Sequence, residues 1–179
     1  MVKSNNMSIG ILGGSFDPAH RGHLAISKIA IEKIKLRKVF WMVVKKNPFK
    51  NRPLYSLEQR IKKAKKITSG INKIQVSYLD EIIGSSRSID MIKYLVNKKK
   101  LKNIFLIIGS DNLIKFHKWK SWKKIVKLTK LVVFSRRGYD RKSKKSVVAK
   151  YLKNKIIFIN NKPIIISSSN LRYKLQKRC

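Results

Sequence analysis

The sequence has almost no cysteine and no long apolar run. Its one cysteine, Cys179, excludes a disulfide framework and a thiolate metal site, in keeping with a reducing, cytoplasmic compartment. No apolar run approaches the ~20 residues that span a bilayer. The first eight residues also lack the apolar centre of a signal peptide. We therefore expect a cytoplasmic protein that does not associate with membranes.

Negative charge is equally scarce, with 8 Asp and Glu against 44 Lys and Arg and a formal net charge of +36. Such an excess can indicate binding to nucleic acid or to an acidic membrane surface. The lysines are spread along the whole chain, however, and Lys, Ile and Asn, which have AT-rich codons, are abundant together. No zinc finger, helix-turn-helix or aromatic RNA-binding motif is present. We therefore favour compositional bias over a nucleic-acid role, although a positive field would help to recruit anionic substrates.

The length of 179 residues and the 43% hydrophobic content predict one folded domain over residues 1–179. Apolar runs typical of buried parallel strands alternate with amphipathic helices, which predicts an α/β, Rossmann-like, doubly wound parallel sheet with a strand order such as 3-2-1-4-5. The stretch from 140 to 146 is polar and basic, and we expect it to be mobile. The expected strands are 9–12, 39–44, 74–79, 104–108, 131–134, an edge strand at 156–159 and a short run at 164–167; the expected helices begin near 21, 57 (with Ser56 as N-cap), 89, 113, 119 and 169.

The strongest motif is Gly13-Gly-Ser-Phe-Asp-Pro-Ala-His-Arg-Gly-His23, which follows the first strand. Gly13 and Gly14 allow a sharp turn and the close approach of a ligand. A helix that begins near Arg21 would direct its N–H groups and the positive end of its dipole toward a phosphate. His20 and His23 lie one helical turn apart and can face the same phosphate. The glycine spacing differs from the dinucleotide fingerprint, so we predict a nucleotide-phosphate site of another kind.

A second motif, Gly109-Ser-Asp-Asn-Leu-Ile-Lys-Phe-His-Lys-Trp119, follows the fourth strand. In the expected strand order this loop lies beside the first motif, at the point where ligands bind to such sheets. Asp111 can bridge ribose hydroxyls, and it can also serve as N-cap for a helix that begins at Asn112. We expect His117 to lie on the surface. Near the end of the chain, Ser167, Ser168, Ser169 and Arg172 form a hydroxyl-rich helix start that is suited to phosphate.

These residues carry a family resemblance. The first motif resembles the G-T/S-F-D-x-x-H-x-G-H signature of the nucleotidyltransferase superfamily, and Ile166-Ser-Ser-Ser-Asn-Leu-Arg172 resembles its I-S-S-T-x-I-R element. The double glycine, Pro18 and both histidines are most similar to the bacterial nicotinate-nucleotide adenylyltransferase family. The segment from Gly109 to Trp119 resembles the G-x-D-x-L-x-x-F-x-x-W element of that family.

The resemblance implies transfer of the adenylyl group of ATP to nicotinate mononucleotide in NAD biosynthesis, with His20, His23 and Arg172 as the catalytic residues and Mg²⁺ carried on ATP. Because no carboxylate cluster offers a metal cage, no metal ligand is expected among the side chains. The implied ATP contacts are Gly13, Gly14, Ser15, Phe16, His20, His23, Gly109, Asp111, Ser167, Ser168, Ser169 and Arg172.

The same resemblance implies contacts to nicotinate mononucleotide from Lys50, Ser86, Ser88 and Trp119. Trp119 would stack on the pyridine ring, although packing in the core is its other possible role. Ser86-Arg-Ser-Ile-Asp90 is similar to the S-Y-T-x-D segment of the family, with Arg87 in place of an aromatic residue. Lys50 matches the basic residue of the family's P-P-H-K loop, and Lys46 could share its contact with the substrate.

Two other functions stay open. One is a sister adenylyltransferase of the superfamily, such as phosphopantetheine adenylyltransferase; the other is a basic nucleic-acid-binding protein on the same scaffold. The sequence does not distinguish a monomer from a homo-oligomer or nicotinate from nicotinamide mononucleotide.

Overall fold

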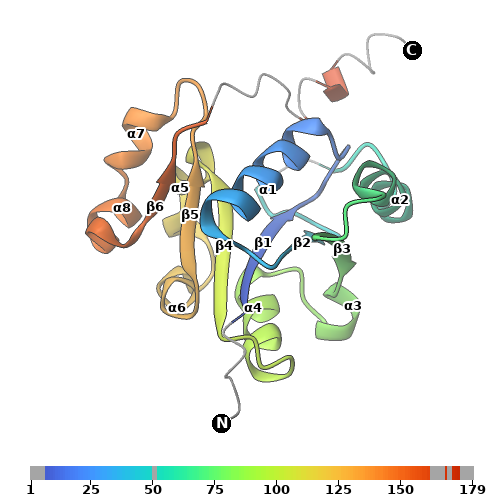
Figure 1. Cartoon of the computed structure of the whole chain (residues 1–179), viewed down its shortest axis with the longest axis horizontal. Coiled ribbons are helices and arrows are strands. Elements are labelled where there is room, and N and C mark those ends of the chain that lie inside the picture. The colour runs from blue at the N-terminus through green and yellow to red at the C-terminus, as the bar shows by residue number, and fades with distance from the viewer. Residues whose placement is uncertain (1–6, 50–51, 162–167, 169–170, 174–179) are drawn as a thin grey trace.

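The computed structural model describes residues 7–49, 52–161, 168 and 171–173. Within these residues, six parallel strands form one sheet in the order β3-β2-β1-β4-β5-β6 (Figure 1). The predicted order 3-2-1-4-5 is confirmed, and the predicted edge strand adds to its outer side. The strands are β1 Ser8–Gly14, β2 Lys38–Val43, β3 Ile74–Tyr78, β4 Asn103–Gly109, β5 Lys130–Phe134 and β6 Ile157–Ile159.

Helices connect the strands, and most begin close to their predicted starts. Ser56 is the N-cap of α2, as predicted, and its side chain accepts a hydrogen bond from the N–H of Gln59, whose own side chain accepts from the N–H of Ser56. The helices are α1 Arg21–Ile34, α2 Leu57–Thr68, α3 Asp80–Ile83, α4 Ser88–Asn97, α5 Ser110–Lys115, α6 Trp122–Leu128, α7 Asp140–Lys144 and α8 Val147–Leu152, with 3-10 turns η1 Phe116–Lys118 and η2 Lys153–Lys155.

Helices cover both faces of the sheet (Figure 1), and a hydrophobic core lies on each face. Alternate residues of each strand point to opposite faces. In β1, for example, Ile11 contributes to the core under α4, α5, α6 and α8, and Leu12 contributes to the core under α1 and α2. The doubly wound arrangement is therefore confirmed, and both faces of β1 and β4 are covered.

Residues 140–146, which the sequence predicts to be mobile, are largely helical. This stretch begins with α7 and leads directly into α8. Two small polar side chains, Ser143 and Ser146, are buried there, and the Ser146 hydroxyl accepts a hydrogen bond from the N–H of Ala149 to cap α8. The lysines of the stretch are exposed to solvent. Their abundance is the reason that composition alone suggested a mobile segment.

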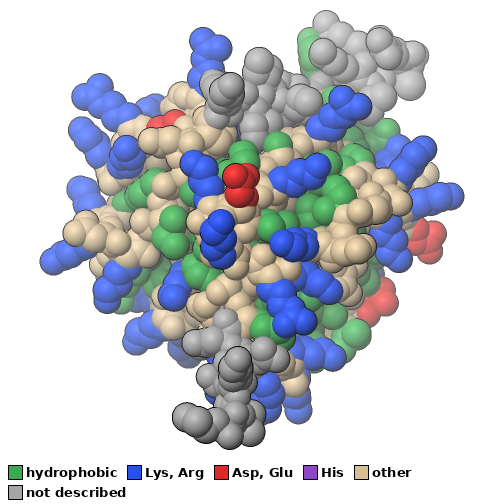
Figure 2. All heavy atoms as spheres, in the orientation of Figure 1, with side chains coloured by type: hydrophobic (Ala, Val, Ile, Leu, Met, Phe, Trp, Pro, Cys, Tyr) green, Lys and Arg blue, Asp and Glu red, His purple; other side chains and the backbone are tan. Residues whose placement is uncertain are grey.

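Basic side chains cover the visible face without gathering over one element (Figure 2). The five aspartates, by contrast, all accept hydrogen bonds within the fold. In the part of the chain that the structure describes, the recorded ion pairs are two, and both involve an arginine rather than a lysine. The carboxylates therefore connect segments of the fold and do not balance the lysines.

Two findings concern the rest of the chain. Among the described residues, no helix is long and apolar enough to cross a membrane. The apolar run at 164–167 lies outside the described residues, as does most of the helix predicted from 169, of which residues 171–173 are described and helical.

Candidate functional site

The first motif bends later than its sequence predicts. Gly13 and Gly14 belong to β1, so the prediction of a turn at these glycines is wrong. The chain changes direction at Phe16, which has a φ of 48°, and a cis peptide bond joins Asp17 to Pro18. The glycines still leave room for a ligand, because a Cβ added to Gly13 would meet no atom within 4 Å.

His20 and His23 lie together at the start of α1, as predicted. Their ring centroids are 3.8 Å apart. His20 is the N-cap, and its Nδ1 accepts a hydrogen bond from the N–H of Gly22 at 3.1 Å, while Nδ1 of His23 accepts from the N–H of His20 at 3.3 Å. A neutral imidazole whose Nδ1 accepts carries its proton on Nε2. Both rings are thus oriented through Nδ1 by main-chain N–H groups at the helix start.

The side chain of Phe16 is 2% exposed and packs beneath the histidines. Its ring stacks on Trp41 with centroids 5.0 Å apart and lies 4.9 Å from the ring of His23. Trp41 is fixed in turn by a 2.8 Å hydrogen bond from its Nε1 to the hydroxyl of Ser27. The predicted ATP contacts of the buried residues Ser15 and Phe16 would therefore come from their main chain.

The last motif contacts the first one, although the two lie near opposite ends of the chain. Nη1 of Arg172 donates to the carbonyl oxygen of Asp17 at 2.7 Å and lies 3.5 Å from its Oδ2. The hydroxyl of Ser168 donates to the carbonyl oxygen of Pro18 at 3.1 Å. The two predicted phosphate motifs thus meet at their described residues; Ser167 and Ser169 lie outside the described residues.

The second motif lies beside the first because β4 pairs with β1, with Leu12 opposite Ile107. The predicted N-cap role of Asp111 is wrong: α5 begins at Ser110 with Gly109 as its N-cap, so Asp111 is in the first helical turn. Oδ2 of Asp111 pairs with Nη1 of Arg136 at 2.6 Å. Oδ1 of Asp111 is buried, with no hydrogen-bond partner among the described residues.

Arg136 is not among the residues that the sequence predicts for the site. The signal was its position directly after a strand, at the carboxyl edge where ligands bind. Its N–H donates to Oδ1 of Asp140 at 2.9 Å and lies 3.0 Å from the Ser110 hydroxyl, so the loop after β5 is fastened to the start of α5.

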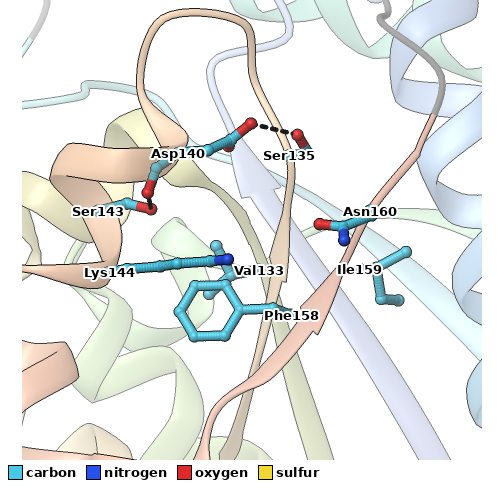
Figure 3. A pocket seen from close by; sticks show the side chains of 8 residues that line it. All are labelled: Val133, Ser135, Asp140, Ser143, Lys144, Phe158, Ile159 and Asn160. Carbon is cyan, nitrogen blue, oxygen red and sulfur yellow. Dashed lines mark hydrogen bonds between the residues drawn. The ribbon is translucent and has the colours of Figure 1, made fainter.

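Asp140 accepts hydrogen bonds from this loop and lines a small hollow at the outer edge of the sheet. Burial raises the pKa of Asp140, but hydrogen bonds from the Ser135 hydroxyl and the Arg136 N–H lower it more, so its pKa lies below the ordinary value. Figure 3 shows the Ser135–Asp140 bond above the hollow. The hollow lies between β5, β6 and α7 and contains no predicted site residue. Its lining residues are Val133, Ser135, Asp140, Ser143, Lys144, Phe158, Ile159 and Asn160.

The predicted substrate residues lie after β3 and after α5. The hydroxyl of Ser86 donates to Oδ2 of Asp80, and Ser88 is the first residue of α4. Trp119 is half-buried, with its ring stacked on Phe116 at a centroid distance of 4.7 Å. Lys50 lies outside the described residues.

His117 does not match the prediction of a surface residue. It is half-buried, and its Nδ1 has no hydrogen-bond partner among the described residues. Within the same described ranges, no group of three His, Cys, Asp or Glu side chains could hold a metal ion.

Arg60 is a second residue that the sequence analysis missed. It is 2% exposed and contacts the first motif. The signal was its place on the apolar face of α2, among Leu57, Ile61 and Ala64. Burial lowers its pKa, and the nearby charge of Asp17 opposes that shift.

Comparison with known proteins gives consistent matches. The family model described as cytidylyltransferase-like matches residues 11–174. A probable nicotinate-nucleotide adenylyltransferase from Pelagibacter ubique is 50% identical over 179 residues, covering 96% of this chain and 99% of that protein. One from Nitratiruptor is 35% identical, covering 96% of this chain and 91% of that protein.

A solved structure also matches the fold. The nicotinic acid mononucleotide adenylyltransferase of Plasmodium falciparum, complexed with NaAD, has a TM-score of 0.74. It is 19% identical to this chain and covers 93% of it, while 83% of that structure is matched.

Proposed function

This chain belongs to the nicotinate-nucleotide adenylyltransferase family, within the cytidylyltransferase-like proteins, and we propose on this basis that it adenylylates nicotinate mononucleotide. The products are nicotinate adenine dinucleotide and pyrophosphate. The structural observation that best supports this proposal is the meeting of the first and last motifs, through Arg172 on Asp17 and Ser168 on Pro18.

The reaction needs no nucleophile from the protein. A phosphate oxygen of nicotinate mononucleotide forms a bond to the α-phosphorus of ATP, and the bond from that phosphorus to the bridging oxygen of the β-phosphate breaks. Pyrophosphate leaves with the electron pair of the broken bond. The protein accelerates this step by aligning the two phosphates and by stabilising the charge that develops on them.

His20, His23 and Arg172 are the residues that we assign to charge stabilisation. Each ring is held through Nδ1 by a main-chain N–H, which fixes its orientation at the start of α1. The start of α1 adds its own N–H groups and the positive end of its dipole. Gly13 and Gly14 allow the triphosphate to approach the main chain of β1.

The adenosine and nicotinate ends occupy neighbouring parts of the same edge. Gly109 and Asp111 receive the adenosine, with a buried carboxylate oxygen suited to accept from a ribose hydroxyl. Ser86, Ser88 and Trp119, together with Lys50, receive the nicotinate mononucleotide. The flat indole of Trp119 suits stacking on a heteroaromatic ring.

Mg²⁺ enters as part of the ATP substrate. In residues 7–161, apart from 50 and 51, the side chains form no three-ligand cage, whereas phosphate oxygens suit this ion well. The protein then binds the complex through donors and cations. A cytoplasmic location and either a monomeric or a homo-oligomeric state remain predictions.

Pyrophosphate release tests the proposal. The protein is given Mg²⁺ and ATP with nicotinate mononucleotide, nicotinamide mononucleotide or phosphopantetheine, each in a separate reaction. We expect the fastest release with nicotinate mononucleotide. Release with phosphopantetheine alone would assign the chain to the sister activity. No release from folded protein, together with salt-sensitive DNA binding, would favour the nucleic-acid role.

A further inference from the structure

We propose that the buried Arg60 is a positioning residue that aligns the two substrate half-sites, so that it governs the transfer step more than the binding of either substrate. This inference rests on the proposed function. Arg60 is not among the predicted substrate contacts, and its recorded hydrogen bonds all go to main-chain carbonyl groups. It acts through the main chain of the first motif and of the loop that follows β2.

The guanidinium of Arg60 binds carbonyl oxygens of the first motif and of both ends of the loop between β2 and α2. Nη1 donates to the carbonyl of Ser15 at 2.7 Å and to that of Val44 at 2.8 Å. Nη2 donates to the carbonyl of Lys45 at 3.2 Å, and Nε donates to that of Tyr55 at 3.2 Å. All three nitrogens are therefore used on the main chain, in a site with almost no exposure to solvent.

Asp17 holds the same loop from the other side. Its Oδ1 accepts from the N–H of Tyr55 at 3.0 Å, and its Oδ2 accepts from the N–H of Leu54 at 2.9 Å. Tyr55 is consequently held at its N–H by Asp17 and at its carbonyl by Arg60. Because Asp17 also accepts from Arg172, the loop after β2, the first motif and the last motif meet at Asp17.

A path of hydrogen bonds continues from Arg60 to the predicted nicotinate side. Arg60 holds the carbonyl of Lys45, and the N–H of Lys45 donates to Oδ2 of Asp80 at 2.7 Å. The same oxygen of Asp80 accepts from the hydroxyl of Ser86. The path thus runs from Ser15, in the predicted ATP half-site, to Ser86, in the predicted nicotinate half-site.

Only arginine can make this set of contacts. Its planar fork presents five N–H donors in fixed directions, whereas lysine has one nitrogen and no fixed plane. A lysine at position 60 keeps the charge but must leave some of these carbonyl groups without a donor. The two half-sites then lose their fixed separation, while each can still bind its own substrate.

The effect on the reaction follows from the geometry of in-line attack. A misplacement of about 1 Å between the reacting groups can reduce the rate by about 100-fold. We therefore expect Arg60→Lys to lower kcat at saturation of both substrates by about 100-fold. The dissociation constants of ATP and of nicotinate mononucleotide, each measured alone by calorimetry, should stay close to those of the wild type.

The matched control is Ile104→Ala. Ile104 is 1% exposed and lies near the amino end of β4, at the opposite edge of the sheet from the motifs. This variant also loses buried contacts, so it reports what lower stability alone does to turnover. All proteins are assayed well below their melting temperatures, with the folded fraction measured by circular dichroism.

Asp80→Ala is a second variant that interrupts the path without altering a buried arginine. We expect it to lower kcat with little change in melting temperature, and it decides the matter if Arg60→Lys does not fold. The inference is overturned if Asp80→Ala has the kcat of the wild type. It is also overturned if the folded variants Arg60→Lys and Ile104→Ala lose kcat equally. A wild-type protein that releases no pyrophosphate overturns the proposed function, and this inference with it.

Discussion

Arg136 and Asp111 join the ends of two neighbouring strands, with 2.6 Å between Nη1 of Arg136 and Oδ2 of Asp111. The pair occupies one oxygen of the carboxylate. The other oxygen, Oδ1, is buried beside the main chain of Gly109 and has no partner among the described residues. The arginine thus fixes the carboxylate in one orientation, with an acceptor left for the proposed ribose.

Asp111→Ala should weaken ATP binding. Loss of a hydrogen bond to a charged group costs about 1.5–3 kcal/mol, so we expect the KM for ATP to rise by about 10- to 100-fold. Stability should fall by less than about 1 kcal/mol, because the ion pair is partly exposed to solvent. Steady-state kinetics with ATP, 2′-deoxy-ATP and 3′-deoxy-ATP measure the effect. If the wild type and Asp111→Ala discriminate equally against both deoxy analogues, Asp111 does not bind the ribose.

Gly109→Ala should displace the same carboxylate. A Cβ at position 109 would lie 2.5 Å from Oδ1 of Asp111, so the side chain must rotate away from Arg136. We expect a rise in the KM for ATP like that of Asp111→Ala. The double variant should be no worse than Asp111→Ala alone, since both changes act on one group. Additive losses in the double variant would contradict this explanation.

His23→Ala should lower turnover far more than stability. Removing one preorganised donor to a developing charge costs about 100- to 1,000-fold in kcat. The weak cap that His23 gives to the N–H of His20, at 3.3 Å, is worth at most about 1–2 kcal/mol. Pyrophosphate release and urea denaturation measure the two effects.

The third histidine provides the matched control for this prediction. His117→Ala removes an imidazole from η1, outside the first motif, and we expect near-normal turnover. Near-normal turnover in His23→Ala as well would exclude the proposed histidine mechanism.

Asp140 should make stability depend on pH in the acid range. Its folded pKa lies below the ordinary value of 3.8, so it stabilises the fold above the unfolded pKa. That contribution is lost as the pH falls through the folded pKa. Asp140→Asn should therefore be less stable than the wild type at neutral pH, and the difference should shrink on acidification.

Urea denaturation over this range measures the difference in the free energy of unfolding. Glu32→Gln, a change at an exposed position of α1, is the control and should show a constant difference. A difference for Asp140→Asn that stays constant with pH would contradict the role of its charge.

The central strands of the sheet were predictable because they are short, apolar and buried on both faces, as in Ile104 to Ile108. The position of the second motif beside the first was likewise predictable, because it follows from the strand order. Interactions between distant segments were not. Nothing local to Arg136 predicts that Asp111 lies opposite, and nothing local to Arg60 predicts that its guanidinium donates to carbonyl groups of the first motif and of the loop after β2. The positive φ of Phe16, whose ring stacks on Trp41, is likewise recorded by no turn signal in the sequence.

The use of the aspartates inside the fold has a consequence for how this sequence can vary. Each of them ties one segment to another, and the lysines form none of the recorded ion pairs of the described residues. A surface position can therefore drift to lysine without drawing a carboxylate away from the loops that carry the motifs. The chain can accumulate positive charge under codon bias and keep its architecture, whereas a single aspartate lost from these junctions cannot be replaced by charge elsewhere.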